Sequence, residues 1–472
     1  MGYRFGVDDV AFLRSRHGAK ALEMVSALPL TDRSMLADVT EARSRYAPHD
    51  AALIETVRCR RRAAGKLRHA DDLLLTDDAL QQATASPVAG HRATEIATRW
   101  PGAVVHDVTC SIGGELIELV AVPGIGGVIG SDLDRVRLAM ARHNTVVQQS
   151  TGVQQSTGVQ QSTGVQQSTV AQQSTGVQQS TGVQQSTGVQ QSTVAQQNTV
   201  AQQNTVDPKS MAIGTGRVPT LLVADALTPT SRADVFLADP ARRSGTGRVF
   251  RLDALTPPLL DVLMTYAGRP LVVKCAPGLD YQVLRDRFGF AGQVQVTSLD
   301  SSVREACLWS GPGIDDGRRA TVMRTDADGT VRVWEITDAE SDDVAVGDPG
   351  TFLLDPDGAV VRAGLVRHYA HRHGLWQIDP HIAYLTGDSV PDGERGFRII
   401  ERLPSTGEKV LRKALTSYDC GSLEILVRGL DVDPDSLRKR LKLKGSRPLA
   451  LVLTRIGRKG VGFVCEPGVR AG

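Results

Sequence analysis

The pattern of hydrophobic and polar positions divides the chain into three stretches. Up to residue 99, apolar residues recur three and four positions apart, as in AKALEMVSAL, which predicts amphipathic helices. Over residues 100–314, short β-branched runs alternate with helical patterns, which predicts a parallel sheet covered by helices. Beyond that, alternating stretches such as ATVMRTDADGTVRVWEI, with its Asp-Gly turn, predict antiparallel strands and a few helices.

These patterns predict an α/β protein of several parts, as a length of 472 residues also suggests. We expect a helical N-terminal cap over residues 1–99 and a doubly wound α/β domain over residues 100–314. Two small α+β modules should follow, over residues 315–392 and 393–472.

A six-residue unit, T(G/V)(V/A)QQ(S/N), is repeated ten times from Thr145 to Asn204. Gln, Ser and Thr dominate the unit, so stacked copies would have little apolar surface to bury. We therefore expect residues 145–206 to be a disordered insertion in a surface loop of the α/β domain. A β-helix is the alternative interpretation.

Four β-branched runs of the α/β domain each lead into an acidic residue. They are, in chain order, VVHDVTCSIGGELIEL, GVIGSDLDRVRLAMARHN, TLLVADALT and ADVFLADPARR. Parallel strands present their carboxyl ends at one edge of a sheet, where ligands bind. Asp132 follows Asp107 by roughly 25 residues, close to the spacing at which doubly wound folds hold ribose hydroxyls. The set predicts a nucleotide-cofactor site, and the lack of GxGxxG and GxxxxGK[ST] patterns argues against a dinucleotide and a nucleoside triphosphate.

In this order, the segments resemble the motifs of class I S-adenosylmethionine-dependent methyltransferases, which have a Rossmann-like sheet. DVTCSIGGE is similar to the first motif, SDLD to the ribose-binding strand end, VADA to the motif beside the adenine, and DPAR to the catalytic-edge motif. The resemblance covers residues 74–311 outside the repeat. FLLDPDGAVVRAGLV and RKALTSYDCGSLEILVRGLDVDPDSLRKRLKLKG extend it to bacterial proteins with a ferredoxin-like module and a C-terminal THUMP-like domain.

The resemblance implies S-adenosyl-L-methionine as the cofactor. The implied cofactor-binding residues are Asp107, Ser111, Gly113, Gly114, Asp132, Asp225 and Ala226. Among these, Asp107 would orient the methionine part and Asp132 would hold the ribose hydroxyls. Ser111 stands where the family often has glycine, and Glu115 stands where it often has aspartate.

The implied catalytic residues are Asp239, Pro240 and Arg242, in the fourth motif. Methyltransferases that act on base amines commonly have an aromatic residue here, which stacks on a flipped base, and this motif has none. Asp239 could accept a proton or a hydrogen bond from a target amine, and Arg242 or Arg243 could pair with a phosphate. A salt bridge that closes the domain explains the arginine equally well.

Two other sets of residues are candidates for a functional site. Cys275, in VVKCAPG, lies roughly where uridine-C5 methyltransferases have a cysteine nucleophile, and Lys274 could lower the pKa of its thiol. A small buried cysteine at a strand end is the favoured interpretation. His368 and His371 share a helix face but His373 does not, so we expect no metal site.

The composition of the chain predicts its cellular compartment and its binding partner. The six cysteines are scattered without a CxxC pair, no apolar run is long enough for a membrane span, and no signal peptide is evident, so we expect a cytoplasmic protein. The net charge is only +2, but residues 395–472 contain 17 basic and 8 acidic residues. This excess, densest in RKRLKLKG, favours RNA as the partner, although a solvated helix face is the alternative.

Together, these features predict a methyltransferase that acts on RNA, at a base of tRNA or rRNA. The alternatives are a noncatalytic RNA-binding protein with a vestigial methyltransferase fold, and a uridine-C5 methyltransferase that uses Cys275. DNA, protein or a small molecule as the substrate is a further alternative.

Overall fold

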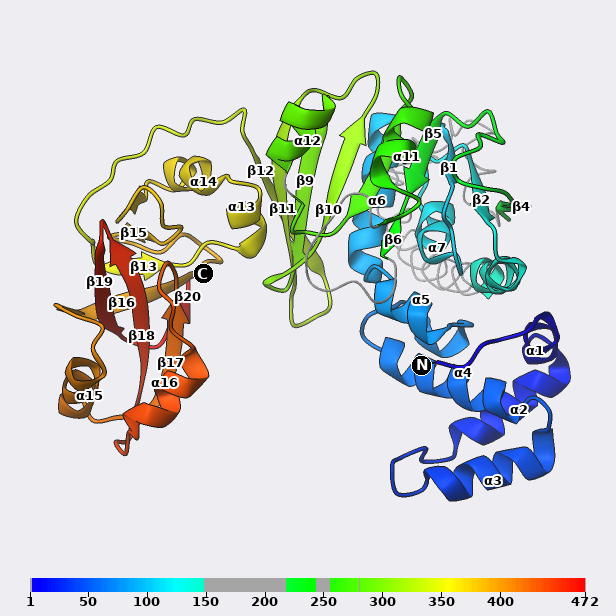
Figure 1. Cartoon of the computed structure of the whole chain (residues 1–472), viewed down its shortest axis with the longest axis horizontal. Coiled ribbons are helices and arrows are strands. Elements are labelled where there is room, and N and C mark those ends of the chain that lie inside the picture. Colours follow the sequence, from blue (N-terminus) through cyan, green and yellow to red (C-terminus); the bar gives the residue numbers. More distant parts are fainter. Residues whose placement is uncertain (1, 148–217, 243–254, 280, 472) are drawn as a thin grey trace, which may run out of the picture. The chain divides into compact units, whose positions relative to one another are not determined.

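The computed structural model describes residues 2–147, 218–242, 255–279 and 281–471, apart from the side chain of Arg242. The chain divides into two compact units (Figure 1). The first unit contains Met1–Lys274 and Ser310–Pro312, and the second contains Cys275–Trp309 and Gly313–Gly472. From residue 148 onward, the expected disordered insertion lies outside the described residues.

Helices form the N-terminal part of the first unit, as predicted. They are α1 (Val7–Leu13), α2 (Arg16–Ser26), α3 (Met35–Tyr46), α4 (Asp50–Ala63), η1 (Ala70–Asp72), α5 (Asp77–Gln82) and α6 (Ser86–Arg99). The N-terminus of α5 is capped, because the Thr76 side chain accepts a hydrogen bond from the Ala79 backbone N–H. The apolar core of these helices also includes Ile112 and Ile117, so the helical cap and the α/β domain share one core.

A five-stranded parallel sheet follows in the first unit. Its strands are β1 (Val104–Asp107), β2 (Gly127–Asp132), β4 (Thr220–Val223), β5 (Val235–Ala238) and β8 (Leu271–Cys275), in the order β8-β5-β1-β2-β4. The helices that accompany them are α7 (Gly114–Ala121), a helix over residues 135–147 and α11 (Leu259–Thr265), and β6 (Ala241–Arg242) pairs with β7 (Leu255–Thr256). Because β1 pairs with β2 on one side and β5 on the other, the carboxyl end of β1 lies where the strand order reverses. Doubly wound folds bind ligands at this point.

The second unit contains two groups of strands. The first group is β9 (Gln293–Leu299), β10 (Ser302–Ser310), β11 (Gly317–Thr325) and β12 (Val331–Thr337), in the order β12-β11-β9-β10, with α12 (Tyr281–Phe288) between β8 and β9 in the chain. The predicted Asp-Gly hairpin is confirmed, since β11 and β12 pair antiparallel and Gly329, in the turn, has a φ of 87°.

The second group is an eight-stranded sheet. Its strands are β13 (Phe352–Leu354), β14 (Trp376–Gln377), β15 (Leu385–Gly387), β16 (Arg395–Leu403), β17 (Cys420–Val427), β18 (Arg447–Ile456), β19 (Lys459–Cys465) and β20 (Val469–Arg470). The helices of this region are α13 (Gly358–Arg362), α14 (Val366–Arg372), α15 (Glu408–Ser417) and α16 (Pro434–Leu441). α15 and α16 pack their buried leucines into one core with β17 and β18.

The predicted fold class is confirmed: an α/β protein with a helical N-terminus and a C-terminal sheet module. Hydrogen-bonded strand pairs join residues on opposite sides of the expected module boundaries. β11 pairs with β9 across residue 315, and β13 pairs with β16 across residue 393. The boundaries at residues 315 and 393 therefore stay a prediction. In the described parts of the chain, no helix is long and apolar enough to cross a membrane.

Candidate active site

A cavity of about 450 Å³ lies at the carboxyl edge of the parallel sheet in the first unit. Its walls come from the loop after β1, the end of β2, the residues after β4 and β5, Lys274 on β8, and residues 79–84 of the helical cap. This volume is within the range of small-molecule sites, which is about 300–1,000 Å³. The cavity is therefore large enough for a nucleotide-sized cofactor.

Most of the predicted site residues line this cavity. They are Asp107, Ser111, Gly114, Asp132, Asp225, Ala226 and Asp239. Gly113 and Pro240 are adjacent in sequence to lining residues but do not themselves line the cavity. The backbone of Arg242 pairs with Leu255, while its side chain lies outside what the structure describes.

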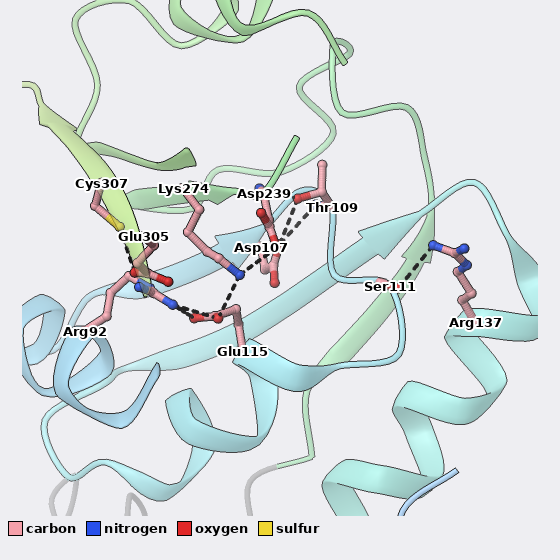
Figure 2. A network of polar contacts seen from close by, with 10 residues as sticks. All are labelled: Arg92, Asp107, Thr109, Ser111, Glu115, Arg137, Asp239, Lys274, Glu305 and Cys307. Carbon is pink, nitrogen blue, oxygen red and sulfur yellow. Dashed lines mark hydrogen bonds and ion pairs between the residues drawn. The ribbon is translucent and has the colours of Figure 1, made fainter. Parts of the chain in front are cut away.

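The carboxylate of Asp132 connects the ends of β1 and β2. Its Oδ2 accepts a hydrogen bond from the backbone N–H of Ser111 at 3.0 Å, and its Oδ1 accepts one from Asp134 at 2.8 Å. Arg137 donates to Ser111 Oγ at 3.3 Å, as Figure 2 shows. Ser111 has a φ of 50°, a left-handed conformation that glycine adopts at less cost than serine. The bonds from Asp132 and Arg137 hold the serine in this conformation.

Gly113 allows the loop after β1 to pack closely against the helix over residues 135–147. Its φ is 84°, and a Cβ at this position would lie 3.1 Å from the Cβ of Ala141, on the helix over residues 135–147. Glycine is therefore needed both for the backbone conformation and for the approach of the helix. α7 begins directly after this turn, at Gly114.

Asn144 joins the helical cap to the loop. Its buried side chain accepts a hydrogen bond from Leu74 N–H at 2.8 Å and donates to the carbonyls of Leu74 and Ile112 at 3.0 and 2.9 Å. Because Ile112 is next to Ser111, this amide fixes the loop against the segment at Leu74, which lies 70 positions before Asn144 in the chain.

Asp107, at the end of β1, is 1% exposed. Burial, together with the charge of nearby Glu115, raises the pKa of Asp107 to about 8. Its Oδ1 accepts a hydrogen bond from the Thr109 N–H at 3.0 Å. Thr109 Oγ1 in turn accepts a hydrogen bond from the Asp239 N–H at 2.6 Å, so the ends of β1 and β5 are connected.

Four charged residues, from α6, α7, β8 and the end of β5, form a network at the wall of the cavity (Figure 2). Lys274 Nζ donates to Asp239 Oδ2 at 2.6 Å and to Glu115 Oε1 at 3.4 Å. Arg92, on α6, donates to both oxygens of Glu115 at 2.8–3.1 Å. Burial opposes the ionisation of Glu115, but the charges of Arg92 and Lys274 outweigh it and lower the pKa of Glu115 to about 2. Glu115 is thus a buried anion with two cationic partners.

Asp225 and Ala226 lie on the far side of β2 from this network, in the turn after β4. Asp225 Oδ1 accepts a hydrogen bond from the Leu227 N–H at 2.9 Å. The Tyr266 hydroxyl donates to the Ala226 carbonyl at 2.7 Å, which ties this turn to the end of α11. The turn therefore has a fixed backbone at the cavity wall.

Cys275 is buried and is not among the described residues that line the cavity. Successive residues of a strand point to opposite faces. Lys274 on β8 points into the cavity, so its neighbour Cys275 faces away from it. In the histidine set, His371 Nδ1 lies 3.1 Å from the Asp343 carbonyl, whereas His373 packs against the ring of Tyr369.

Sequence reasoning missed several residues of this site. Arg92, Thr109 and Arg137 were not singled out, and Lys274 was considered only as a neighbour of Cys275. A lysine inside the apolar run LVVKC was the available signal, because a buried ammonium needs an anionic partner. The cap residues of the cavity wall carry no comparable signal.

Comparisons with known proteins bear on the identity of the chain. A family described as THUMP domain-like matches residues 394–467, and a domain of unknown function (DUF8688) matches residues 6–63. Two relatives, from two strains of Mycobacterium tuberculosis, are each described as an uncharacterised S-adenosylmethionine-dependent methyltransferase. Each is 42% identical over 441 residues, which cover 90% of this chain and 99% of the relative. The crystal structure of a presumed methyltransferase from Porphyromonas gingivalis has a similar fold, with a TM-score of 0.61 and 16% identity over 92% of this chain and 98% of that one.

Proposed function

Since this chain belongs to the S-adenosylmethionine-dependent methyltransferases, we propose that it transfers the methyl group of that cofactor to RNA. The cofactor supplies an electrophilic methyl group on a sulfonium when it is bound. The protein then has to hold the cofactor and the acceptor in line and keep water out. The cavity at the carboxyl edge of the parallel sheet is the proposed place for this.

The cavity fits S-adenosylmethionine in size and in chemistry. The carboxyl groups of Asp107, Asp132 and Asp225 are among those that line it, and the cofactor carries a cationic sulfonium, an ammonium group and two ribose hydroxyls. We assign the ribose to Asp132, the adenine to the turn at Asp225 and Ala226, and the methionine part to Asp107 and the loop from Ser111 to Gly114. The helix N-terminus at Gly114 favours the carboxylate of the methionine part.

The acceptor is proposed to approach the catalytic-edge motif. Asp239 lines the cavity, and its side chain is 36% exposed, so it is accessible to an incoming group. Pro240 fixes the backbone after it, and Arg242 is proposed to contact a phosphate of the acceptor.

The C-terminal part of the chain supports RNA as the acceptor. The THUMP-like match covers residues 394–467, within the segment that contains 17 basic and 8 acidic residues. On α16, Leu437 and Leu441 are buried, whereas the basic residues between them, Arg438, Lys439 and Arg440, are exposed. A basic helix face of this kind can follow an RNA backbone without reading its sequence.

The proposal is tested by incubating the full chain with methyl-labelled S-adenosylmethionine and unmodified tRNA and rRNA transcripts. We expect label in RNA, and a variant with Lys439→Glu and Lys444→Glu should lower the rate about 10-fold at moderate salt. Lys20→Glu, at an exposed position of α2, is the matched control and should leave the rate unchanged. Cofactor binding without transfer to any RNA would argue for another acceptor, and no cofactor binding would favour a noncatalytic RNA-binding protein.

A further inference from the structure

Lys274 and Asp239 form an ion pair at the cavity wall that a cofactor site alone does not require. Lys274 Nζ lies 2.6 Å from Asp239 Oδ2, and the side chains are 7% and 36% exposed, respectively. The lysine is therefore sheltered, while the side chain of Asp239, which Figure 2 shows beside Lys274, is more accessible and lines the cavity. An acceptor that approaches Asp239 also comes close to the ammonium group.

Within this network, Lys274 lies closer to Asp239 than to Glu115. Glu115 has Arg92 as a partner through three contacts of 2.8–3.1 Å, and its contact with Lys274 is longer, at 3.4 Å. The shorter contact of Lys274 is the one to Asp239. Asp239 and Lys274 thus form one ion pair at the cavity wall. Glu115 and Arg92 form a second ion pair, which contacts Lys274 through Glu115.

This arrangement suits an oxygen nucleophile better than a base amine. An amine becomes positively charged as it attacks a methyl carbon, and an adjacent ammonium opposes that charge. A hydroxyl becomes negatively charged as it loses its proton, and a preorganised ammonium stabilises that charge. Methyltransferases that act on base amines commonly stack the flipped base on an aromatic side chain, and residues 239–242 contain none.

We propose that the acceptor is a ribose 2′-hydroxyl of RNA, with Lys274 and Asp239 as the catalytic residues that receive it. The inference rests on the proposed function and names the acceptor atom, ribose oxygen rather than the base suggested by the sequence. The 2′-hydroxyl is the hydroxyl that each internal nucleotide of RNA offers.

The chemical step balances with the groups present. The ribose oxygen forms a bond to the methyl carbon, and the carbon–sulfur bond breaks with its electron pair retained by sulfur. The hydroxyl proton passes to the carboxylate of Asp239, from which it is lost to water. Lys274 stabilises the oxygen while this charge develops and is not consumed.

The deciding experiment uses the full chain, methyl-labelled S-adenosylmethionine and unmodified tRNA and rRNA transcripts, followed by alkaline digestion of the product. Alkali cleaves RNA through a free 2′-hydroxyl, so a 2′-O-methylated nucleotide stays in a resistant dinucleotide. We expect the label in dinucleotides. Label in mononucleotides would place the methyl group on a base and overturn the inference while leaving RNA methylation intact. RNA without label would instead overturn the proposed function.

The role of Lys274 is tested by substitution. Lys274→Met should slow methyl transfer about 100-fold, with the Kd for S-adenosylmethionine by titration calorimetry changed less than about 3-fold. Lys274→Arg keeps the charge and should recover part of the rate. Lys20→Met, at an exposed position of α2, should match the wild type. Wild-type transfer by Lys274→Met would overturn the catalytic role. If Lys274→Met loses cofactor binding, Lys274→Arg and Asp239→Asn with intact binding decide the question through their transfer rates.

Discussion

The carboxylate of Asp132, at the end of β2, accepts a hydrogen bond from the backbone N–H of Ser111, in the loop after β1, at 3.0 Å. The two residues come from neighbouring parallel strands, whose carboxyl ends meet at one edge of the sheet. The same carboxylate lines the cavity. Asp132 therefore shapes the loop after β1 and also lines the cavity in which we propose that it holds the cofactor ribose.

Asp132→Ala should weaken S-adenosylmethionine binding about 10- to 100-fold. The substitution removes charge-assisted hydrogen bonds worth about 1.5–3 kcal/mol and releases the Ser111 N–H. Titration calorimetry of the purified chain measures the change in Kd. Asp32→Ala, at an exposed position before α3, is the control. An unchanged Kd in Asp132→Ala would place the cofactor elsewhere.

The local part of this site was predictable from the sequence, for a physical reason. Each parallel strand is a short β-branched run that stands out without tertiary information, so the acids that follow, such as Asp107 and Asp132, could be assigned to one sheet edge. The order of these segments along the chain also predicted the α/β fold class.

The remainder depends on contacts between distant segments. Arg92 reaches Glu115 across 23 positions, and Asn144 reaches Leu74 across 70. An arginine on a helix, or an asparagine at the end of a helix, has no sequence pattern that identifies its hydrogen-bond partner. Lys274 could be seen in an apolar strand, but its contact with Asp239 depends on the pairing of β5 with β8.

Gly113→Ala should destabilise the fold more than Gly114→Ala. At Gly113, alanine has to adopt a φ of 84° and place its Cβ 3.1 Å from Ala141, at a cost of about 1–2 kcal/mol or more. At Gly114, the Cβ meets nothing within 4 Å, so the substitution should be neutral or slightly stabilising. Calorimetric melting of the cofactor-free chain compares the two. Equal losses of Tm would contradict the close approach at Gly113.

Asn144→Ala should lower both stability and cofactor affinity. It removes the partners of three buried backbone groups, on Leu74 and Ile112, which predicts a loss of at least about 2 kcal/mol. The loosened loop next to Ser111 should raise the Kd for S-adenosylmethionine. Arg142→Ala, exposed on the same helix, is the control for both measurements. A variant that melts lower but binds the cofactor normally would show that Asn144 supports only the cap.

Cys275→Ala should retain methyl transfer within about 3-fold, since the thiol is buried and faces away from the cavity. A uridine-C5 mechanism requires this cysteine as the nucleophile and predicts complete loss of activity. Transfer to RNA with labelled cofactor measures the difference. The control is Cys307→Ala, which also removes a buried thiol. Cys110→Ala is unsuitable as a control because Cys110 lines the cavity.

Asp107→Asn should stabilise the cofactor-free chain by an amount that grows with pH. The pKa of Asp107 is about 8 in the folded chain, raised mainly by burial, and about 3.9 in an unfolded chain. Below pH 4 the carboxyl is protonated in both the folded and the unfolded chain, so it does not lower the free energy of unfolding. Between pH 4 and 8 only the unfolded chain releases the proton, so wild-type stability falls by up to about 1.4 kcal/mol for each pH unit.

Above pH 8 the folded chain releases the proton as well, and the penalty levels off. Asparagine has no proton to release and keeps an oxygen that can accept the Thr109 N–H, so it escapes this penalty. Melting curves from pH 5 to pH 9 should therefore show a gain in Tm that rises up to about pH 8 and then stays constant, whereas Asp71→Asn, at an exposed position, should show none. A gain that does not change with pH would mean that Asp107 is already ionised at neutral pH, with a counter-charge at the cavity that outweighs its burial.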